Sequence, residues 1–220
     1  MIEITKLTKR FLLPDNSHLE IFDSMDFTVD SWEFIALMWQ SGQGKTTFLN
    51  ILAWLERDYT WRVQILWNNL QDLDDKEITS FRGKHISYIF QEYNLIESLS
   101  VEENIELVLD INHIKRRYES DDILRRVWLL EKKRSYPREL SGWEKQRTAI
   151  ARSFIGETDI ILADEPTGSL DEKNATQVMQ LLQELWSDTQ CTIIMITHSS
   201  EIAQYAQKQY ILEHKKFFKK

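Results

Sequence analysis

The chain has 220 residues, of which 42% are apolar and 28% are charged, as in a soluble domain with a sizeable hydrophobic core. Its net charge of −8 argues against a general nucleic-acid binder. One cysteine, Cys191, excludes an internal disulfide and a cysteine-based metal cluster. No apolar run is long enough to span a bilayer, and the N-terminus lacks a signal-peptide pattern, so we expect a cytoplasmic protein.

Hydrophobic patterning predicts a series of secondary-structure elements. The expected strands, in chain order, cover residues 2–4, 27–29, 34–38, 63–66, 86–90, 160–163 and 192–196. The expected helices cover residues 46–55, 102–114, 121–130, 144–154 and 174–185. Strands that alternate with helices favour a mainly parallel sheet, so the fold class is α/β with an antiparallel β layer at the N-terminus.

The stretch 92–140 differs from the rest because its amphipathic helices have no strand between them. We interpret it as a helical subdomain inserted into a core made of residues 1–91 and 141–220. Residues 214–220 are basic and contain two phenylalanines. We expect them to form a solvated tail, and contact with an anionic membrane surface is the alternative.

The strongest motif stands between a predicted strand and a predicted helix and reads Ser41-Gly42-Gln43-Gly44-Lys45-Thr46-Thr47. Its glycines allow a tight turn whose N–H groups, with the helix N-terminus, can point at phosphate oxygens. Lys45 would reach the β- and γ-phosphates, and the Thr46 hydroxyl would ligate Mg²⁺. The motif predicts a P-loop NTPase core, although the pattern requires glycine where the chain has Trp39.

Two more candidates come directly after predicted strands. Asp164 and Glu165 end the apolar run 160–163, where the first acid can hold Mg²⁺ through water and the second can polarise an attacking water. His198 lies just beyond the strand 192–196. Since the carboxyl ends of parallel strands share one edge of a sheet, all three should lie near the loop. We predict phosphoryl-transfer chemistry there, with His198 near the γ-phosphate.

The segment Leu140-Ser141-Gly142-Trp143-Glu144 begins a predicted helix. Ser141 as N-cap and Glu144 three residues later form a capping-box pattern, which alone would explain the segment without any function.

Taken together, these motifs resemble the ATPase subunit of an ABC transporter. The resemblance rests on 41–47, Gln91, 140–142, the run 164–171 (Asp-Glu-Pro-Thr-Gly-Ser-Leu-Asp) and His198, in this order. Segments 90–96 and 163–168 are similar to the branch with lipoprotein-releasing, macrolide-exporting and cell-division ATPases. The resemblance implies a head-to-tail homodimer that binds two ATP molecules. It also implies a transmembrane permease subunit, contacted by residues 92–140, that holds the chain on the inner face of the cell membrane.

The resemblance assigns a role to each matching residue. Implied catalytic residues are Glu165 as general base, His198 at the γ-phosphate and Gln91, which would couple the site to the permease. Among the implied ATP-binding residues, Phe11 would stack on adenine and Asp171 would act across the dimer. The others are Trp39, Gln40, Ser41, Gly42, Gln43, Gly44, Lys45, Thr46, Thr47, Ser141, Gly142 and Trp143. Implied Mg²⁺ residues are Thr46, Gln91 and Asp164.

Tryptophan stands where the family commonly has glycine, at positions 32, 39, 54, 61, 67, 128 and 143, and the chain has 8 Trp but only 6 Gly. We expect helix C-caps at Trp54 and Trp128 and turns at Trp61 and Trp67, all places that favour glycine. Trp39 and Trp143 should fill space that phosphates need. Trp186, expected after the helix 174–185, fits the rule less clearly.

Two hypotheses explain the tryptophans. The codon UGA is read as tryptophan in some bacterial genetic codes and as glycine in others, so a gene translated with the wrong code would show this pattern. Alternatively, the tryptophans are real and the chain is a catalytically impaired nucleotide-binding scaffold. A soluble ABC ATPase of DNA repair or translation is disfavoured, since the chain has no coiled-coil arm, zinc site or second cassette.

Overall fold

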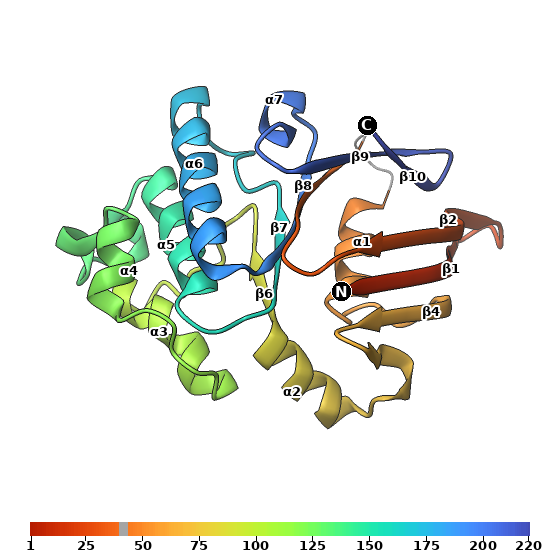
Figure 1. The fold of residues 1–220 in the computed structure, drawn as a ribbon, viewed down its shortest axis with the longest axis horizontal. Helices are drawn as coiled ribbons and strands as arrows, with labels where there is room; N and C mark the ends of the chain where they lie inside the picture. The colour runs from red at the N-terminus through yellow and green to blue at the C-terminus, as the bar shows by residue number, and fades with distance from the viewer. Residues whose placement is uncertain (40–43) are drawn as a thin grey trace.

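The computed structural model describes residues 1–39 and 44–220, and Figure 1 shows their arrangement. A four-stranded sheet has the order β2-β1-β4-β5, with β1 (Ile2–Leu12), β2 (His18–Val29), β4 (Thr60–Ile65) and β5 (Asn68–Asn69). A six-stranded sheet has the order β10-β9-β3-β8-β7-β6, with β3 (Phe34–Met38), β6 (Ile86–Ile89), β7 (Ile160–Asp164), β8 (Thr192–Thr197), β9 (Lys208–Glu213) and β10 (Lys216–Lys219).

The α-helices are α1 (Lys45–Leu52), α2 (Asp75–His85), α3 (Val101–Asn112), α4 (Ser120–Arg126), α5 (Gly142–Phe154), α6 (Glu172–Thr189) and α7 (Ser200–Ala203). Short 3₁₀ turns cover Leu70–Asp72, Leu130–Lys132 and Pro137–Glu139. None of the helices in the described parts of the chain is both long and apolar enough to cross a membrane.

The six-stranded sheet is parallel except for its last pair. Strands β6, β7, β8, β3 and β9 pair in parallel, and β10 pairs with β9 in the antiparallel sense. Strands β7 and β8 are buried on both faces, and their residues alternate between two core clusters. This double burial explains their continuous apolar runs. The predicted α/β fold with an antiparallel N-terminal layer is confirmed.

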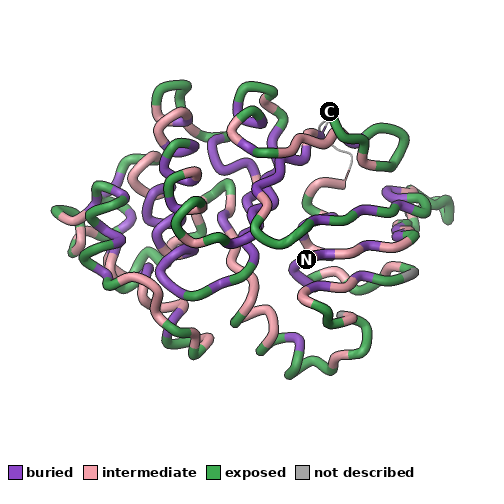
Figure 2. Tube along the Cα trace, viewed as in Figure 1, coloured by how far each residue is buried: buried purple, intermediate pink, exposed green. Residues whose placement is uncertain are grey.

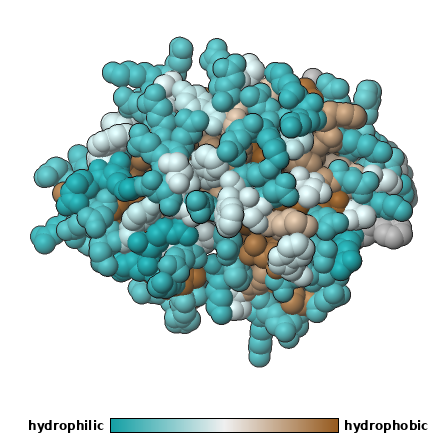
Figure 3. Space-filling model, viewed as in Figure 1, coloured by the Kyte–Doolittle hydropathy of each residue, from teal (hydrophilic) through white to brown (hydrophobic). Residues whose placement is uncertain are grey.

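The two core clusters separate the molecule into two sides. Figure 1 shows α3, α4, α5 and α6 on one side of β6, β7 and β8, and the antiparallel sheet on the other. Helix α1 lies between the two sheets, where Phe48 and Leu49 join residues of both in one cluster. Figure 2 shows buried backbone concentrated in the central strands and the helices facing them. In Figure 3 hydrophilic residues cover most of the visible face.

Two helices, α3 and α4, lie within residues 92–140, as the sequence predicts for this stretch. Helix α3 begins with a capping box in which Glu103 Oε2 accepts from the Ser100 N–H at 2.7 Å. The buried Asn104 fixes the preceding loop, because its amide donates to the carbonyls of Ile96, Leu99 and Ser100. Helix α4 is shorter than expected and ends at Arg126.

The predicted solvated tail is confirmed only in part, because residues 214–216 and 218–220 are exposed but the segment is folded. Lys216–Lys219 forms β10, and Phe217 packs against the rings of Phe27, Phe48 and Trp39, with centroid distances of 4.6, 5.1 and 5.2 Å. Successive side chains of a strand point to opposite faces, so Phe217 can reach the core while Phe218 and the lysines stay exposed.

Two tryptophans lie in secondary-structure elements that differ from the predicted ones. Trp61 is in β4 rather than in a turn, and Trp186 is inside α6, which continues to Thr189.

Candidate nucleotide-binding site

Lys45 begins α1 directly after β3 and the loop that joins them. The residue before it, Gly44, has a left-handed backbone with φ 94°. A Cβ at Gly44 would lie 2.2 Å from Ile21 Cγ2, so only glycine fits at this turn. The Lys45 ammonium forms an ion pair with the Glu165 carboxylate. Residues 40–43 of the predicted loop, Gln40, Ser41, Gly42 and Gln43, lie outside the described residues.

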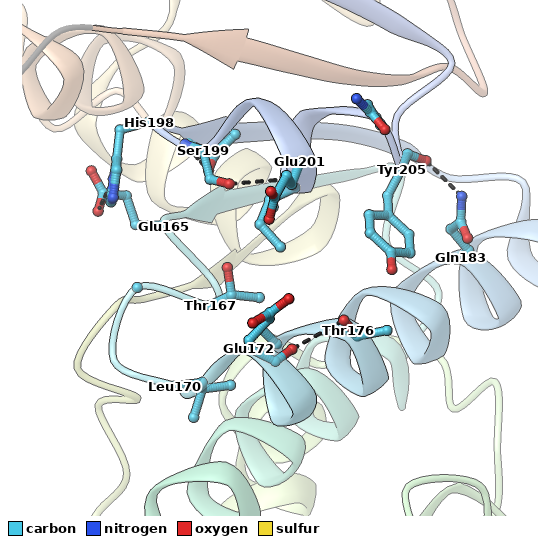
Figure 4. Close-up of a pocket in the computed structure, with 15 residues that line it drawn as sticks. Glu165, Thr167, Leu170, Glu172, Thr176, Gln183, His198, Ser199, Glu201 and Tyr205 are labelled. Atoms are coloured by element: carbon cyan, nitrogen blue, oxygen red, sulfur yellow. Dashed lines mark hydrogen bonds and ion pairs between the residues drawn. The ribbon is translucent and has the colours of Figure 1, made fainter.

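Glu165 stands at the end of β7, which lies beside β8 and so brings it close to His198. Its Oε2 is 3.1 Å from His198 Nδ1, and its N–H donates to the Ile196 carbonyl at 3.0 Å. Figure 4 shows the two side chains facing each other. Glu165 has a left-handed φ of 44°, which is strained for a non-glycine residue and typical of functional positions. The parallel order β3-β8-β7 thus brings Lys45, Glu165 and His198 together, as the sequence predicts.

Asp164 is the last residue of β7 and is half-buried. Burial raises the pKa of its carboxyl group, the neighbouring Glu165 raises it further, and Lys45 opposes both effects. A cation bound beside two adjacent carboxylates lowers the electrostatic free energy of the site, because it offsets their mutual repulsion. The oxygens of Asp164 and the exposed Thr46 are the type of ligand that Mg²⁺ prefers, so the residues present fit the ion.

Gln91 lies beside Glu165. A Cβ at Gly168 would lie 3.4 Å from Gln91 Nε2 and 3.2 Å from Glu165 Oε2, so these three residues adjoin one another. The Tyr93 hydroxyl is 2.8 Å from Ser169 Oγ and would be 3.0 Å from a Cβ placed on Gly142. Tyr93 therefore connects the loop that carries Gln91 to the segments that carry Ser169 and Gly142. Sequence reasoning gave no role to Tyr93 or Ser169, although both stand within the segments that carry the resemblance.

A cavity of about 820 Å³ opens next to Glu165 and His198, between α6 and α7. Figure 4 shows Thr167 and Glu172 along one wall and Tyr205 with Gln183 at the other end. The Gln183 amide donates to the Tyr205 carbonyl at 2.7 Å and thereby joins α6 to the segment after α7. Apart from Glu165 and His198, none of the lining residues was given a role from the sequence, although Thr167, Gly168 and Leu170 stand within the run 164–171 that carries the resemblance.

Phe11 lies on β1, in the antiparallel sheet, and its ring has a cation beside it. Lys9 Nζ is 4.4 Å from the ring centroid, close enough for a cation–π interaction. Lys9 is only 1% exposed and forms 3.2 Å ion pairs with Glu56 and Asp58. The buried Lys9 thus links the Phe11 end of β1 to the loop before β4.

Trp39 directly follows β3, with its side chain packed inside the protein. Its ring is 3% exposed and lies in the core, with centroids 6.0 Å from Phe22 and 5.8 Å from Phe48. Trp143 is half-buried and stacks on Arg147, whose guanidinium carbon is 3.4 Å from the ring centroid. Burial lowers the pKa of Arg147 to about 10. The rings of Trp39 and Trp143 are therefore both in contact with other side chains of the protein.

The remaining predicted residues lie at helix N-termini. Ser141 precedes α5, where Glu144 Oε2 accepts from its N–H at 2.8 Å and from its hydroxyl at 2.6 Å, so the capping interaction is present. Gly142 and Trp143 begin α5. Asp171 caps α6 and accepts from the Asn174 N–H at 2.9 Å. Thr47 comes after Thr46 in the first turn of α1. Ser141 and Asp171 thus have a local capping role, and their predicted roles in ATP binding stay predictions.

Comparison with known proteins identifies the family. The family model described as ABC transporter matches residues 22–168. The chain is 38% identical over 211 residues to the bacitracin export ATP-binding protein BceA of Halalkalibacterium halodurans, covering 94% of this chain and 83% of that one. It is 35% identical to the lipoprotein-releasing system ATP-binding protein LolD of Psychrobacter arcticus, covering 89% and 88%.

A solved structure has the same fold. It is the dimeric post-hydrolysis state of the ATP-binding cassette MJ0796 of Methanocaldococcus jannaschii, bound to ADP and Pi. The match has a TM-score of 0.87 at 30% identity and covers 100% of this chain and 98% of that one. The resemblance to ABC ATPases is therefore confirmed, together with the P-loop NTPase fold. The chain belongs to the ABC transporter family, as one of its ATP-binding ATPase subunits.

Proposed function

We propose that the chain hydrolyses ATP in order to drive a transmembrane permease of an export or mechanotransmission complex. The observation that carries the proposal is the contact of Glu165 with both Lys45 and His198 at the carboxyl edge of the parallel sheet. A phosphate-binding lysine, a carboxylate base and a histidine in one place suit phosphoryl transfer to water. BceA and LolD, whose names refer to export and lipoprotein release, support the direction of transport.

The contacts of Glu165 define how it would act. Its carboxylate accepts a proton from the attacking water, while His198 holds its second oxygen in place. When ATP binds, the three N–H donors of Lys45 would be shared between Glu165 and the β- and γ-phosphates, which would weaken the ion pair with Glu165. Mg²⁺, held by Asp164, Thr46 and Gln91, would neutralise charge on the phosphates.

Two copies would close head to tail on two ATP molecules. Ser141 and Gly142 stand at the N-terminus of α5, where exposed N–H groups favour an anion such as the partner's ATP phosphate. Tyr93, which touches Ser169 and lies next to Gly142, would relay closure to the loop that carries Asp171. The dimeric state of MJ0796 supports this arrangement.

A groove beside α3 is our candidate for the permease contact. It has a volume of about 260 Å³ and is lined by residues of β6, α3 and α5 and of the loop after β6, among them Phe90, Val108 and Ile111. Ile111 is largely exposed, so an apolar segment of a partner could cover it. The groove adjoins Asn94, close to Gln91, which would couple it to the catalytic edge. The chain would thus act on the inner face of the cell membrane.

The test compares two proteins. One is the chain with its tryptophans, and the other has glycine at positions 32, 39, 54, 61, 67, 128 and 143, here called the seven-glycine chain. We expect the seven-glycine chain to bind Mg-ATP and to release phosphate steadily. If it is as inert as the tryptophan chain, the enzyme proposal fails and the impaired scaffold becomes the better description. Turnover by the tryptophan chain itself would instead rule out the scaffold.

A further inference from the structure

Four of the eight tryptophans have a left-handed backbone conformation. Trp32, Trp54, Trp67 and Trp128 have φ values of 68°, 54°, 68° and 53°. Tryptophan thus supplies four of the fifteen non-glycine residues recorded with positive φ, although only 8 of the 220 residues are tryptophan. Bulky residues avoid this region because Cβ approaches the following carbonyl oxygen, and glycine is the residue that adopts it freely.

Two of these positions complete the same helix-ending motif. After α1, the Trp54 N–H donates to the Ile51 carbonyl at 3.1 Å, and the next N–H donates to Asn50 at 2.7 Å. After α4, the Trp128 N–H donates to Arg125 at 3.1 Å, and the next N–H donates to Leu124 at 2.8 Å. This pair of hydrogen bonds is the Schellman motif, whose left-handed position is most often glycine.

A third position belongs to a two-residue hairpin. Ile65 pairs with Asn68, so Leu66 and Trp67 alone make the turn between β4 and β5. Both have positive φ, 48° and 68°, as in a type I′ turn. That turn favours glycine at its second central position, which here is Trp67.

At three of these positions the side chain gives no compensating reason for tryptophan. Trp32, Trp67 and Trp128 are 64%, 75% and 56% exposed, so their rings gain little from burial. Trp54 is buried in the core, so its ring does gain from burial. Its indole N–H has no hydrogen-bond partner, and this offsets part of the gain.

Trp186 shows the opposite pattern. It lies within α6, its ring packs 5.9 Å from that of Phe34, and its indole N–H donates to the Cys191 carbonyl at 2.9 Å. Helical backbone, ring packing and a satisfied indole are the features expected of a tryptophan selected for its side chain.

We propose that the organism inserts glycine at 32, 54, 67 and 128, where UGA codons have been read as tryptophan, and true tryptophan at 186, encoded by UGG. Backbone conformation and side-chain contacts carry this inference, which does not rest on the proposed ATPase activity. The same codon assignment predicts glycine at 39 and 143, where it would complete the phosphate loop and the start of α5.

The decisive experiment is peptide mass mapping of the chain isolated from its own organism, together with the codons of its gene. We expect UGA and glycine at 32, 54, 67 and 128, and UGG and tryptophan at 186. Tryptophan at the four positions in the isolated protein overturns the proposal. Glycine at 186 as well would overturn the distinction between the two groups of tryptophans.

Thermal unfolding of two recombinant variants provides an independent measurement. Replacing the three exposed residues together (Trp32→Gly, Trp67→Gly, Trp128→Gly) should raise Tm, since left-handed strain is removed and no buried ring is lost. The control Trp186→Gly should lower Tm, since it removes a packed ring and a hydrogen bond. A lower Tm in the threefold variant would contradict the argument from backbone strain. Both arms measure unfolding, so an inactive enzyme would not affect their outcome.

Discussion

The two sheets of the molecule hold their candidate residues by different means. At the carboxyl edge of the six-stranded sheet, Lys45, Glu165 and His198 meet because β3, β8 and β7 are adjacent and parallel. In the antiparallel sheet, Phe11 depends on a buried lysine that contacts two acidic residues. The backbone therefore positions the chemistry, whereas side-chain packing positions the expected adenine platform. Changes in the first region should affect turnover, and changes in the second should affect recognition of the base.

The largest effect should come from Glu165→Gln in the seven-glycine chain. The amide cannot accept the proton of water, so turnover should fall by at least about 100-fold, while ATP binding persists and the closed dimer accumulates. Phosphate release and gel filtration with ATP would measure the two effects. Glu172→Gln, which changes a nearby carboxylate of the same cavity, is the control. Normal turnover in Glu165→Gln would remove Glu165 as the base.

Lys45→Ala in the same chain should weaken nucleotide binding by roughly 100-fold, because the charge-assisted contacts to two phosphates are lost. Titration with a fluorescent ATP analogue would measure the affinity. Lys115→Ala, at an exposed lysine that pairs with Glu157, should leave it unchanged. An unaltered affinity in Lys45→Ala would be incompatible with a phosphate loop at this position.

Asp164→Asn should raise the stability of the fold and lower its ATPase activity. The raised pKa of Asp164 means that the fold disfavours the charged carboxylate, so Asn should increase Tm by about 2 °C at pH 7. The gain should shrink as pH falls through the raised pKa and vanish below the ordinary value, where the carboxyl is protonated in both states. Mg-ATP turnover should decline in the same variant. Calorimetry at several pH values would check the sign, and a lower Tm at pH 7 would contradict it.

The smallest effect should come from Lys9→Met, which tests the other sheet. Loss of the cation beside Phe11 should raise the Kd for ATP about threefold. The Kd for inorganic triphosphate, which has no base, should stay the same. Arg10→Met, on the same strand but pairing with Glu20 at the surface, should alter neither value. Equal losses for both ligands would show that Lys9 supports the whole site rather than the platform.

The central strands and the catalytic edge could be predicted from the sequence for a physical reason. A strand buried on both faces must be apolar throughout, and parallel strands deliver the residues beyond their carboxyl ends to one edge of the sheet. The aromatic cluster around Trp39 could not be predicted, since Phe22, Phe48 and Phe217 come from three distant elements. The same is true of Lys9, whose burial depends on the loop at 56–58. Such features need the coordinates because tertiary packing alone creates them.

Strand β3, which leads into the phosphate-binding segment, hydrogen-bonds to β8 on one side and β9 on the other. Both neighbours come from the far end of the chain, so a ribosome exposes β3 long before it exposes either of them. The nascent protein must therefore hold an apolar strand without partners during most of its translation. The sheet around β3 can close only after β9 has left the exit tunnel, so the strand that leads into the phosphate-binding segment is among the last to gain its partners.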